Sequence, residues 1–238
     1  MVDAPVSRLG NQLADALPWS EREWIAAAAR RVFVRRGTVL VDEGQSSPFI
    51  YFPVDALLAS WNRYEGLARV ACSDMAGKRR AAAYSRAMHW RANEGRLQVA
   101  WSGEVWRLPY ESFEVHASAN DHPLRAAIAR LAVATSTINA VRSYCAAEHN
   151  VRQRVTTFLL GLRAERGSNE VPVTHETIGA MLSIRRPSVS EVLADLQRSQ
   201  LIRTNHGHLT FVGGDELERI ACPCNRTISN ILERVGWD

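Results

Sequence analysis

The sequence predicts an α+β fold made of three consecutive units. The first part alternates short apolar runs with turn residues, the middle carries one long heptad pattern, and the last part combines two short helical patterns with a hairpin. These patterns have different periods, so each indicates a different element type. The expected units are a β-roll over residues 1–120, a long dimerisation helix over 121–147 and a helical C-terminal domain over 148–238.

The composition is that of an ordinary globular protein. Of 238 residues, 46% are hydrophobic and 23% are charged, close to the average for soluble domains. We find no run of about 18 apolar residues, as a membrane span requires, and the start MVDAPVSRLGNQL has no signal-peptide pattern. Four cysteines are too few for a disulfide framework. We therefore expect a cytoplasmic protein with no membrane partner.

The N-terminal unit changes from helical to strand texture at about Arg31. Before it, Ser20 and Glu23 have the spacing of a capping box ahead of the helix-forming run EREWIAAAAR. After it, Val, Phe, Ile and Tyr are punctuated by RRG, DEG, SSP and FPV, which is typical of short strands joined by tight turns. A small antiparallel barrel or roll is the expected product. Strand texture returns in LQVAWSGEVWRLPYESF, where SGE is expected to be a turn.

Residues 66–96 interrupt this strand pattern. They are rich in Ala and Arg and show no sustained alternation of apolar and polar positions. We expect a helix-and-loop insertion or a poorly ordered flap, and the sequence does not indicate what this segment does.

A heptad pattern follows from about Asp121. Asp121 or Asn120 can cap a helix here, and Pro123 suits its first turn. Members then recur at spacings of four and three over about three heptads. They are Leu124, Ile128, Leu131, Thr135, Ile138, Arg142 and Cys145. Such a pattern indicates either a helix lying on its own domain or a dimer seam. We favour the seam, with Leu124, Ile128, Leu131 and Ile138 as the dimer interface.

After a second helix at about 150–166, residues 171–212 predict a winged helix-turn-helix. Thr174 is a good N-cap for the helix HETIGAML. Pro187 is tolerated only in a first helical turn, so it sets the start of the next helix, RRPSVSEVLADLQRSQ. LIRTNHGHLTFV then forms two short strands joined across Asn-His-Gly. Helix, turn, helix and β-wing in this order define the motif.

The start of the second of these helices has the chemistry of a DNA contact. A helix N-terminus carries positive potential and free N–H groups, and Arg contacts guanine or phosphate. The candidate DNA-binding residues are Thr174, His175, Arg185, Arg186, Ser188, Ser190 and His206. All 29 basic residues but Lys78 are Arg, and the sequence pI is about 9.1. That surface suits oxyanions, yet a GC-rich coding sequence produces the same bias, so charge alone decides little.

The stretch THETIGAMLSIRRPSVSEVLADLQRSQLI resembles the winged helix of the Crp/Fnr transcription regulators. Its framework IGxxL–xxRxxV–xxxLxxLxxxxLI is present, and Arg186 falls at the family's base-contacting arginine. The resemblance implies a roll like that of cyclic-nucleotide-binding domains, a dimer helix, and a homodimer bound to double-stranded DNA at a palindromic operator. It implies base contact by Arg186. Thr174 and His175 begin the first helix, which crosses the DNA backbone in this motif, so we expect them to hold phosphate. RNA polymerase is a further candidate partner.

The sequence departs from the family pattern in its sensor unit and in its recognition helix. The Gly-Glu pair and Arg-Ser/Thr-Ala cassette that grip a cyclic nucleotide are not visible, and Gly103-Glu104 lies too late in the roll. No cysteine precedes Cys72, so the N-terminal iron–sulfur cluster of Fnr-type members is not expected. Pro187 replaces the acidic residue of the family's recognition helix, so the operator should differ from the best-known one. We expect no cofactor, and the effector, the operator and the sign of regulation stay open.

The remaining motifs indicate neither a metal site nor an enzyme. Cys222-Pro223-Cys224 has a C-x-C spacing, which without two more ligands nearby is weak as a zinc site; we expect a structural role, with redox sensing as the alternative, and no metal. There is no P-loop, Ser-His-Asp set or G-x-G-x-x-G motif, so an enzyme is not expected. The alternative to DNA binding is a ligand-binding or protein-interaction module whose winged helix contacts protein.

Overall fold

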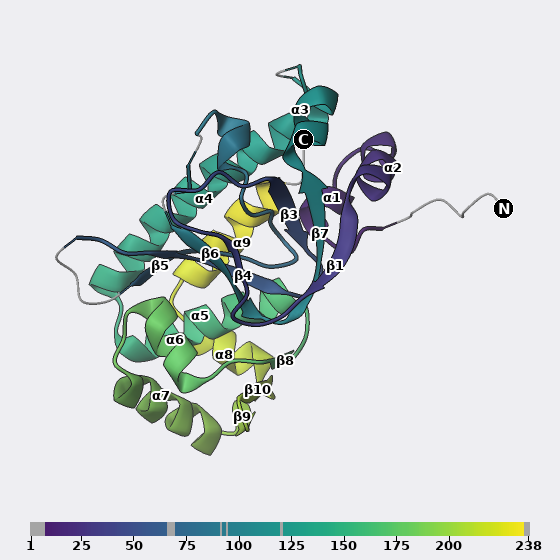
Figure 1. Ribbon diagram of the computed structural model, residues 1–238. Coiled ribbons are helices and arrows are strands. Elements are labelled where there is room, and N and C mark those ends of the chain that lie inside the picture. Colours follow the sequence, from purple (N-terminus) through teal and green to yellow (C-terminus); the bar gives the residue numbers. More distant parts are fainter. Residues whose placement is uncertain (1–7, 66–69, 91, 94, 120, 236–238) are drawn as a thin grey trace.

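The computed structural model describes residues 8–65, 70–90, 92–93, 95–119 and 121–235, and its fold is α+β as predicted (Figure 1). Antiparallel strands fill the N-terminal part. One long helix, α4 (Pro123–Glu148), crosses them, and the remaining helices and a small sheet form the C-terminal end.

Two antiparallel sheets form the roll, after the short helices α1 (Gln12–Asp15) and α2 (Trp19–Ala28). One sheet has the order β1 (Arg30–Val34), β7 (Gly103–Pro109), β3 (Phe49–Pro53). The other has the order β2 (Val39–Val41), β6 (Arg96–Trp101), β4 (Leu57–Asn62), β5 (Ala71–Ala76). Buried aliphatic side chains from both sheets form a shared core. The predicted roll is therefore confirmed.

Two local expectations in this unit are wrong. Helix α2 begins at Trp19 after Pro18, which makes no side-chain capping bond, so Ser20 is not the cap. Ser102 joins β6 to β7, which belong to different sheets, so SGE is not a hairpin turn. Gly103 begins β7 instead, and an added Cβ there would lie 2.5 Å from the backbone nitrogen of Ala56.

The segment 66–96 is not a helix-and-loop insertion. Strand β5 runs through it and pairs with β4, and a short 3-10 turn, η1 (Ser85–Met88), follows. β5 lies at the edge of its sheet, and α4 and α6 (His175–Leu182) approach it. Pairing and packing decide this strand rather than its weak intrinsic preference. Residues 66–69, 91 and 94 lie outside the described part.

Helix α4 packs on its own chain. His122 precedes it and makes no side-chain capping bond, so Asp121 is not the cap, and Asn120 lies outside the described residues. The four predicted seam residues Leu124, Ile128, Leu131 and Ile138 are all 0% exposed within a single chain. The first three join a core with buried side chains of α1, α2 and α3 (Tyr110–His116). No surface of these side chains is left for a second copy, so the seam is the intramolecular alternative that the pattern allowed.

The last helix, α9 (Cys224–Val235), lies along α4 and runs in the opposite direction (Figure 1). Different contacts hold the two ends of the α4–α9 pair together. Cys222, just before α9, meets Cys145 near the end of α4, and Arg130 near the start of α4 donates to the carbonyl of Val235 at 3.3 Å. The chain therefore returns from the C-terminal domain to α4, which sequence patterning did not indicate.

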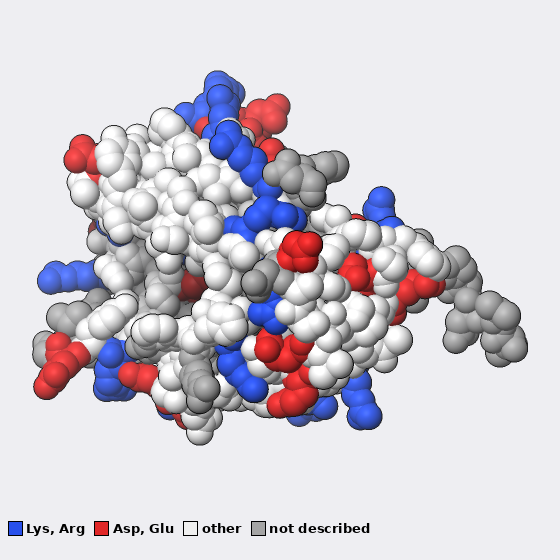
Figure 2. Space-filling model, turned by 90° about the horizontal axis from the view of Figure 1, so that it is seen from above, with Lys and Arg blue, Asp and Glu red and all other residues white. Residues whose placement is uncertain are grey.

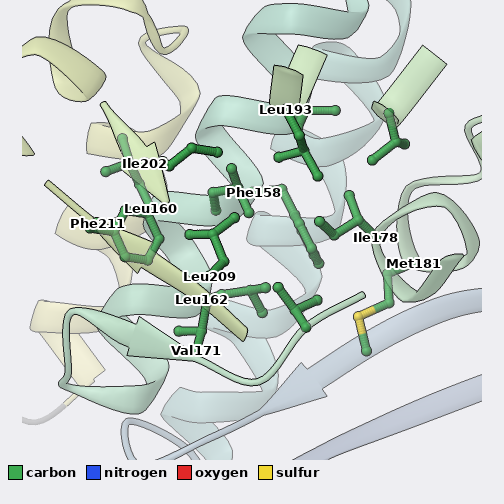
Figure 3. Close-up of a cluster of buried hydrophobic side chains, with 14 of the residues drawn as sticks. Phe158, Leu160, Leu162, Val171, Ile178, Met181, Leu193, Ile202, Leu209 and Phe211 are labelled. Carbon is green, nitrogen blue, oxygen red and sulfur yellow. The ribbon is translucent and has the colours of Figure 1, made fainter. Parts of the chain in front are cut away.

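The winged helix has its own dense core (Figure 3). Its elements are α5 (Val151–Arg166), β8 (Glu170–Val171), α6, α7 (Arg186–Arg198), β9 (Ile202–Asn205), β10 (His208–Phe211) and α8 (Gly214–Ile220). A capping box between Asn150 and Gln153 starts α5, and left-handed Gly167 ends it. Leu57 and Trp101 of the roll belong to the same core. The winged helix is thus docked on the roll.

Candidate nucleic-acid interface

A groove at the end of the molecule lies between α6, α7 and the wing. Its volume is about 460 Å³. Of the sequence-predicted residues, Thr174, His175, Arg186 and His206 line it together. Arg185 lies just before α7, and Ser188 and Ser190 lie in its first two turns, beside the residues that line the groove. The structure therefore gathers the predicted residues around one concave surface.

The start of α6 is held to α7 by side-chain hydrogen bonds. Thr174 is the N-cap, because its hydroxyl oxygen accepts from the backbone N–H of Thr177 at 3.1 Å. Nδ1 of His175 lies 2.9 Å from Oγ of Ser190, whose hydroxyl donates to the carbonyl of Arg186 at 3.0 Å. With its hydrogen on that carbonyl, the Ser190 oxygen accepts from Nδ1–H of His175, which fixes the orientation of the ring. This chain of bonds sets where the first helix stands relative to the second.

The start of α7 is basic and exposed. Arg185 is the N-cap without a side-chain capping bond, Arg186 begins the helix, and no acidic residue lies in its first turn. Both arginines are exposed, whereas Ile184 and Val189 are buried and anchor this end. A helix N-terminus with uncapped N–H groups and no carboxylate favours an anionic partner.

The turn before α7 depends on close backbone contact. An added Cβ on Gly179 would lie 2.8 Å from the carbonyl oxygen of Ile184, so only glycine fits without a shift. Ser183 takes the left-handed conformation, with φ +54°, as α6 ends. These two positions set the angle at which α7 leaves α6.

The wing is a tight hairpin. His206 and Gly207 join β9 to β10 with φ of +43° and +85°, as a type I′ turn requires at both central positions. The exposed ring of His206 is in short contact with the side chain of Asn205, and it lines the groove. The predicted strand pair is confirmed, and a DNA contact by His206 stays a prediction.

Arg36 of the roll also lines the groove, and the sequence did not indicate it. It lies in the RRG turn between β1 and β2, and its guanidinium donates to Oγ1 of Thr177 in α6 at 3.3 Å. The two residues are 141 positions apart in the chain, and no local pattern links them. Arg36 adds a cation to the groove and ties the roll to the helix-turn-helix.

The opposite face has mixed charge. Seen from above in Figure 2, basic and acidic side chains lie beside one another, and wide areas are uncharged. Among the coloured residues of that view, no broad single-sign patch stands out. DNA affinity depends on neutralising phosphates with clustered cations. The groove at the other end is therefore the better candidate surface.

Among the residues that the structure describes, none of those lining the interior of the roll offers a cation free to bind a phosphate. A cavity of about 180 Å³ lies there, and its polar lining includes Asp74 of β5 and Asn139 of α4. Pockets for drug-sized ligands usually measure about 300–1,000 Å³. Arg80 is 2% exposed, and its guanidinium already pairs with the Asp74 carboxylate. Although burial disfavours its charge, the carboxylates of Asp74 and Glu165 raise the pKa of Arg80.

Cyclic AMP is accordingly expected not to bind inside the roll. Its phosphate would meet the carboxylate of Asp74, and the buried cation beside it is already neutralised. Calorimetry with cyclic AMP should show no binding heat, and guanosine cyclic phosphate should behave alike. A micromolar dissociation constant for the wild type would contradict this expectation.

Comparisons with known proteins agree with this architecture. A family model described as the Crp-like helix-turn-helix domain matches residues 153–220. FixK2 from Bradyrhizobium japonicum is 14% identical, with a TM-score of 0.69 over 82% of this chain and 98% of that chain. A CRP-family transcriptional regulator from Thermus thermophilus is 20% identical, with a TM-score of 0.65 over 80% and 96%. The c-di-GMP responsive regulator CLP from Xanthomonas campestris is 15% identical, with a TM-score of 0.61 over 80% and 96%.

At these identities the likeness to solved structures shows a shared fold. No curated protein sequence matches the chain. Within the described residues, none of the helices has both the length and the hydropathy needed to cross a bilayer.

Proposed function

We propose that this chain, which carries a Crp-like helix-turn-helix domain at residues 153–220 and shares the fold of solved CRP-family regulators, is a Crp/Fnr family protein that binds specific double-stranded DNA as a homodimer to regulate transcription. The observation that carries the proposal is the groove, where Thr174, His175, Arg186 and His206 meet at the basic start of α7. In this motif the second helix enters the major groove, and its first residues meet base edges.

The proposed contacts divide by position. Arg186, at the exposed start of α7, contacts a base, since Arg binds guanine O6 and N7 in a bidentate way. Thr174 and His175 start α6, which crosses the backbone in this motif, so they hold phosphate. The remaining predicted contacts, to phosphate or to groove edges, are Arg185, Ser188, Ser190 and His206.

The proposed dimer uses the face of α4 that the chain leaves uncovered. Val133 is 68% exposed and Tyr144 is 60% exposed, and Thr137 and Ala140 are exposed between them. These positions recur at spacings of three and four, so they form one stripe. To enter successive major grooves, the two α7 helices of this dimer must stand about 34–36 Å apart.

The rest of the proposal follows from this assignment. The protein works in the cytoplasm without a catalytic step, and RNA polymerase is the partner that a DNA-bound activator would contact. A cavity of about 470 Å³ lies where β5, α4, α5, α6 and α9 meet. A molecule bound there would change the orientation of the roll relative to the winged helix only if it binds one orientation more tightly than another.

Salt dependence distinguishes DNA binding from the protein-contact alternative. Fluorescence anisotropy of a labelled duplex should give an affinity that falls steeply as salt rises, because each phosphate contact releases counterions. Changing both Arg185 and Arg186 to Ala should reduce that slope. A matched control is Arg198→Ala, at the far end of α7, where the side chain is 78% exposed. If the wild type has no salt-dependent affinity for duplex DNA, the winged helix contacts protein instead.

A further inference from the structure

Three cysteines and a histidine meet at the end of α4. Cys145 lies in the last turn of that helix and His149 directly follows it, while Cys222 lies in the link between α8 and α9 and Cys224 begins α9. One ligand atom from each lies within 4.8 Å of every other. Sγ of Cys145 is 3.5 Å from Sγ of Cys222, and Sγ of Cys224 is 3.7 Å from Nδ1 of His149.

These separations are those of ligands around one tetrahedral ion. With Zn–S of about 2.3 Å and Zn–N of about 2.0–2.1 Å, two sulfurs lie about 3.8 Å apart and a sulfur and a nitrogen about 3.5 Å apart. A [4Fe–4S] cluster binds its four ligands through four irons and a [2Fe–2S] cluster binds them as two pairs on two irons, so ligands on different irons must stand further apart. The geometry therefore fits a single ion better than a cluster.

The surroundings also fit a metal centre. The three cysteines are buried, with exposures of 8%, 2% and 5% for Cys145, Cys222 and Cys224, and they are free thiols. Thr157 of α5 lies behind them, with its Oγ1 3.0 Å from Sγ of Cys222, and it accepts from the Cys222 backbone N–H at 3.1 Å. Such outer partners orient ligands in metal sites. Packing alone explains buried thiols but not a histidine nitrogen at ligand spacing among them.

We propose that Cys145, His149, Cys222 and Cys224 bind one zinc ion in a closed, four-coordinate site. Three cysteines and one histidine are a ligand set of structural zinc sites. This revises the expectation of no metal, because α4 supplies the two ligands that the C-x-C motif lacks in the sequence. The contacts between the two pairs span 77 and 75 residues.

The ion would join the end of α4 to the start of α9. The first of these elements carries the proposed dimer stripe, and the second follows directly from the winged-helix domain. A bond between them restricts how the DNA-binding domain turns relative to the dimer helix. Metal binding needs deprotonated thiols and releases their protons, and the binding free energy adds to the stability of the fold.

Metal content of the purified, reduced full-length protein tests the site. Mass spectrometry of zinc should give one ion per chain for the wild type. Cys222→Ser and Cys224→Ser should lower zinc affinity by more than the roughly 10–100-fold that loss of an outer-shell partner costs. His149→Ala, at a less buried ligand, should weaken zinc binding while the chain stays folded by circular dichroism.

Cys72→Ser is the matched control, because Cys72 lies in β5 outside the cluster, and its zinc content should equal that of the wild type. Cobalt added to metal-free protein should give the strong visible absorption of tetrahedral thiolate ligation, and the ligand variants should lose it. The proposal is overturned if reduced wild type takes up neither zinc nor cobalt, or if zinc content survives in both cysteine variants. The zinc proposal is also wrong if the protein forms a Cys145–Cys222 disulfide and takes up no metal after that disulfide is reduced. The two cysteines would then be a redox pair.

Discussion

Leu131→Glu is expected to unfold the chain, whereas Val133→Glu, two positions later on the same helix, should leave it folded and break the dimer. Leu131 is 0% exposed and Val133 is 68% exposed. An unpaired carboxylate in the core costs several kcal/mol, against a total stability of about 5–15 kcal/mol for a typical domain. At the exposed stripe, the same change instead places two like charges across the proposed two-fold axis.

Thermal unfolding and sedimentation together check this pair. Leu131→Glu should show a strongly lowered Tm or no cooperative transition. Val133→Glu should still unfold in one cooperative transition, because its core is unchanged. It should sediment at half the mass of the wild-type dimer. Leu131→Met and Val133→Ala are the conservative controls, the first expected to cost less than about 1.5 kcal/mol. A folded, monomeric Leu131→Glu protein would show instead that the buried heptad residues form the interface.

Arg186→Ala is expected to weaken binding to the true operator by about 1–3 kcal/mol and to remove discrimination at one base pair per half-site. The reason is the position of Arg186 at the exposed start of α7. Thr174→Ala should weaken all sequences about equally. Because Thr174 is also the N-cap of α6, this change should lower stability by about 0.5–2 kcal/mol, so its unfolding must be measured alongside.

Binding of each variant to operators with single base changes separates the two roles. Arg198→Ala serves as control, since it removes a cation from the same helix outside the groove. It should keep both affinity and discrimination. If Arg186→Ala lowers affinity for every operator variant by one common factor, Arg186 is a phosphate contact rather than a base contact.

Local signals in the sequence predicted the winged helix well. Thr174 caps α6, Pro187 lies in the first turn of α7, and Gly207 takes the positive φ of the wing turn. Each of these residues acts on its own few neighbours, so its effect is visible without knowledge of the rest of the chain.

The heptad pattern of α4 shows the limit of such signals. Periodicity identified Leu124, Ile128, Leu131 and Ile138 as one buried face, and that is what they are. Periodicity does not specify which surface covers this face, because packing against α1, α2 and α3 buries an apolar stripe as well as a second copy of the chain would.

Features that depend on distant segments were not predictable. Strand β5 owes its conformation to pairing with β4 and to packing against α4 and α6, not to its own sequence ACSDMA, which has no β-branched or aromatic residue. Arg36 reaches the groove between α6, α7 and the wing from a turn of the roll, and His149 meets Cys224 only because α9 returns along α4. The sequence separation of these contacts hides them from any local pattern.

Selection of duplexes from a random pool by the purified wild-type protein is the direct test of DNA recognition. We expect an enriched, two-fold symmetric sequence whose half-sites are centred about 10–10.5 base pairs, or a multiple of one helical turn, apart. We also expect the Arg186→Ala protein to enrich a motif with one position per half-site relaxed. Sequencing that shows no enrichment over the starting pool would contradict DNA recognition by this chain.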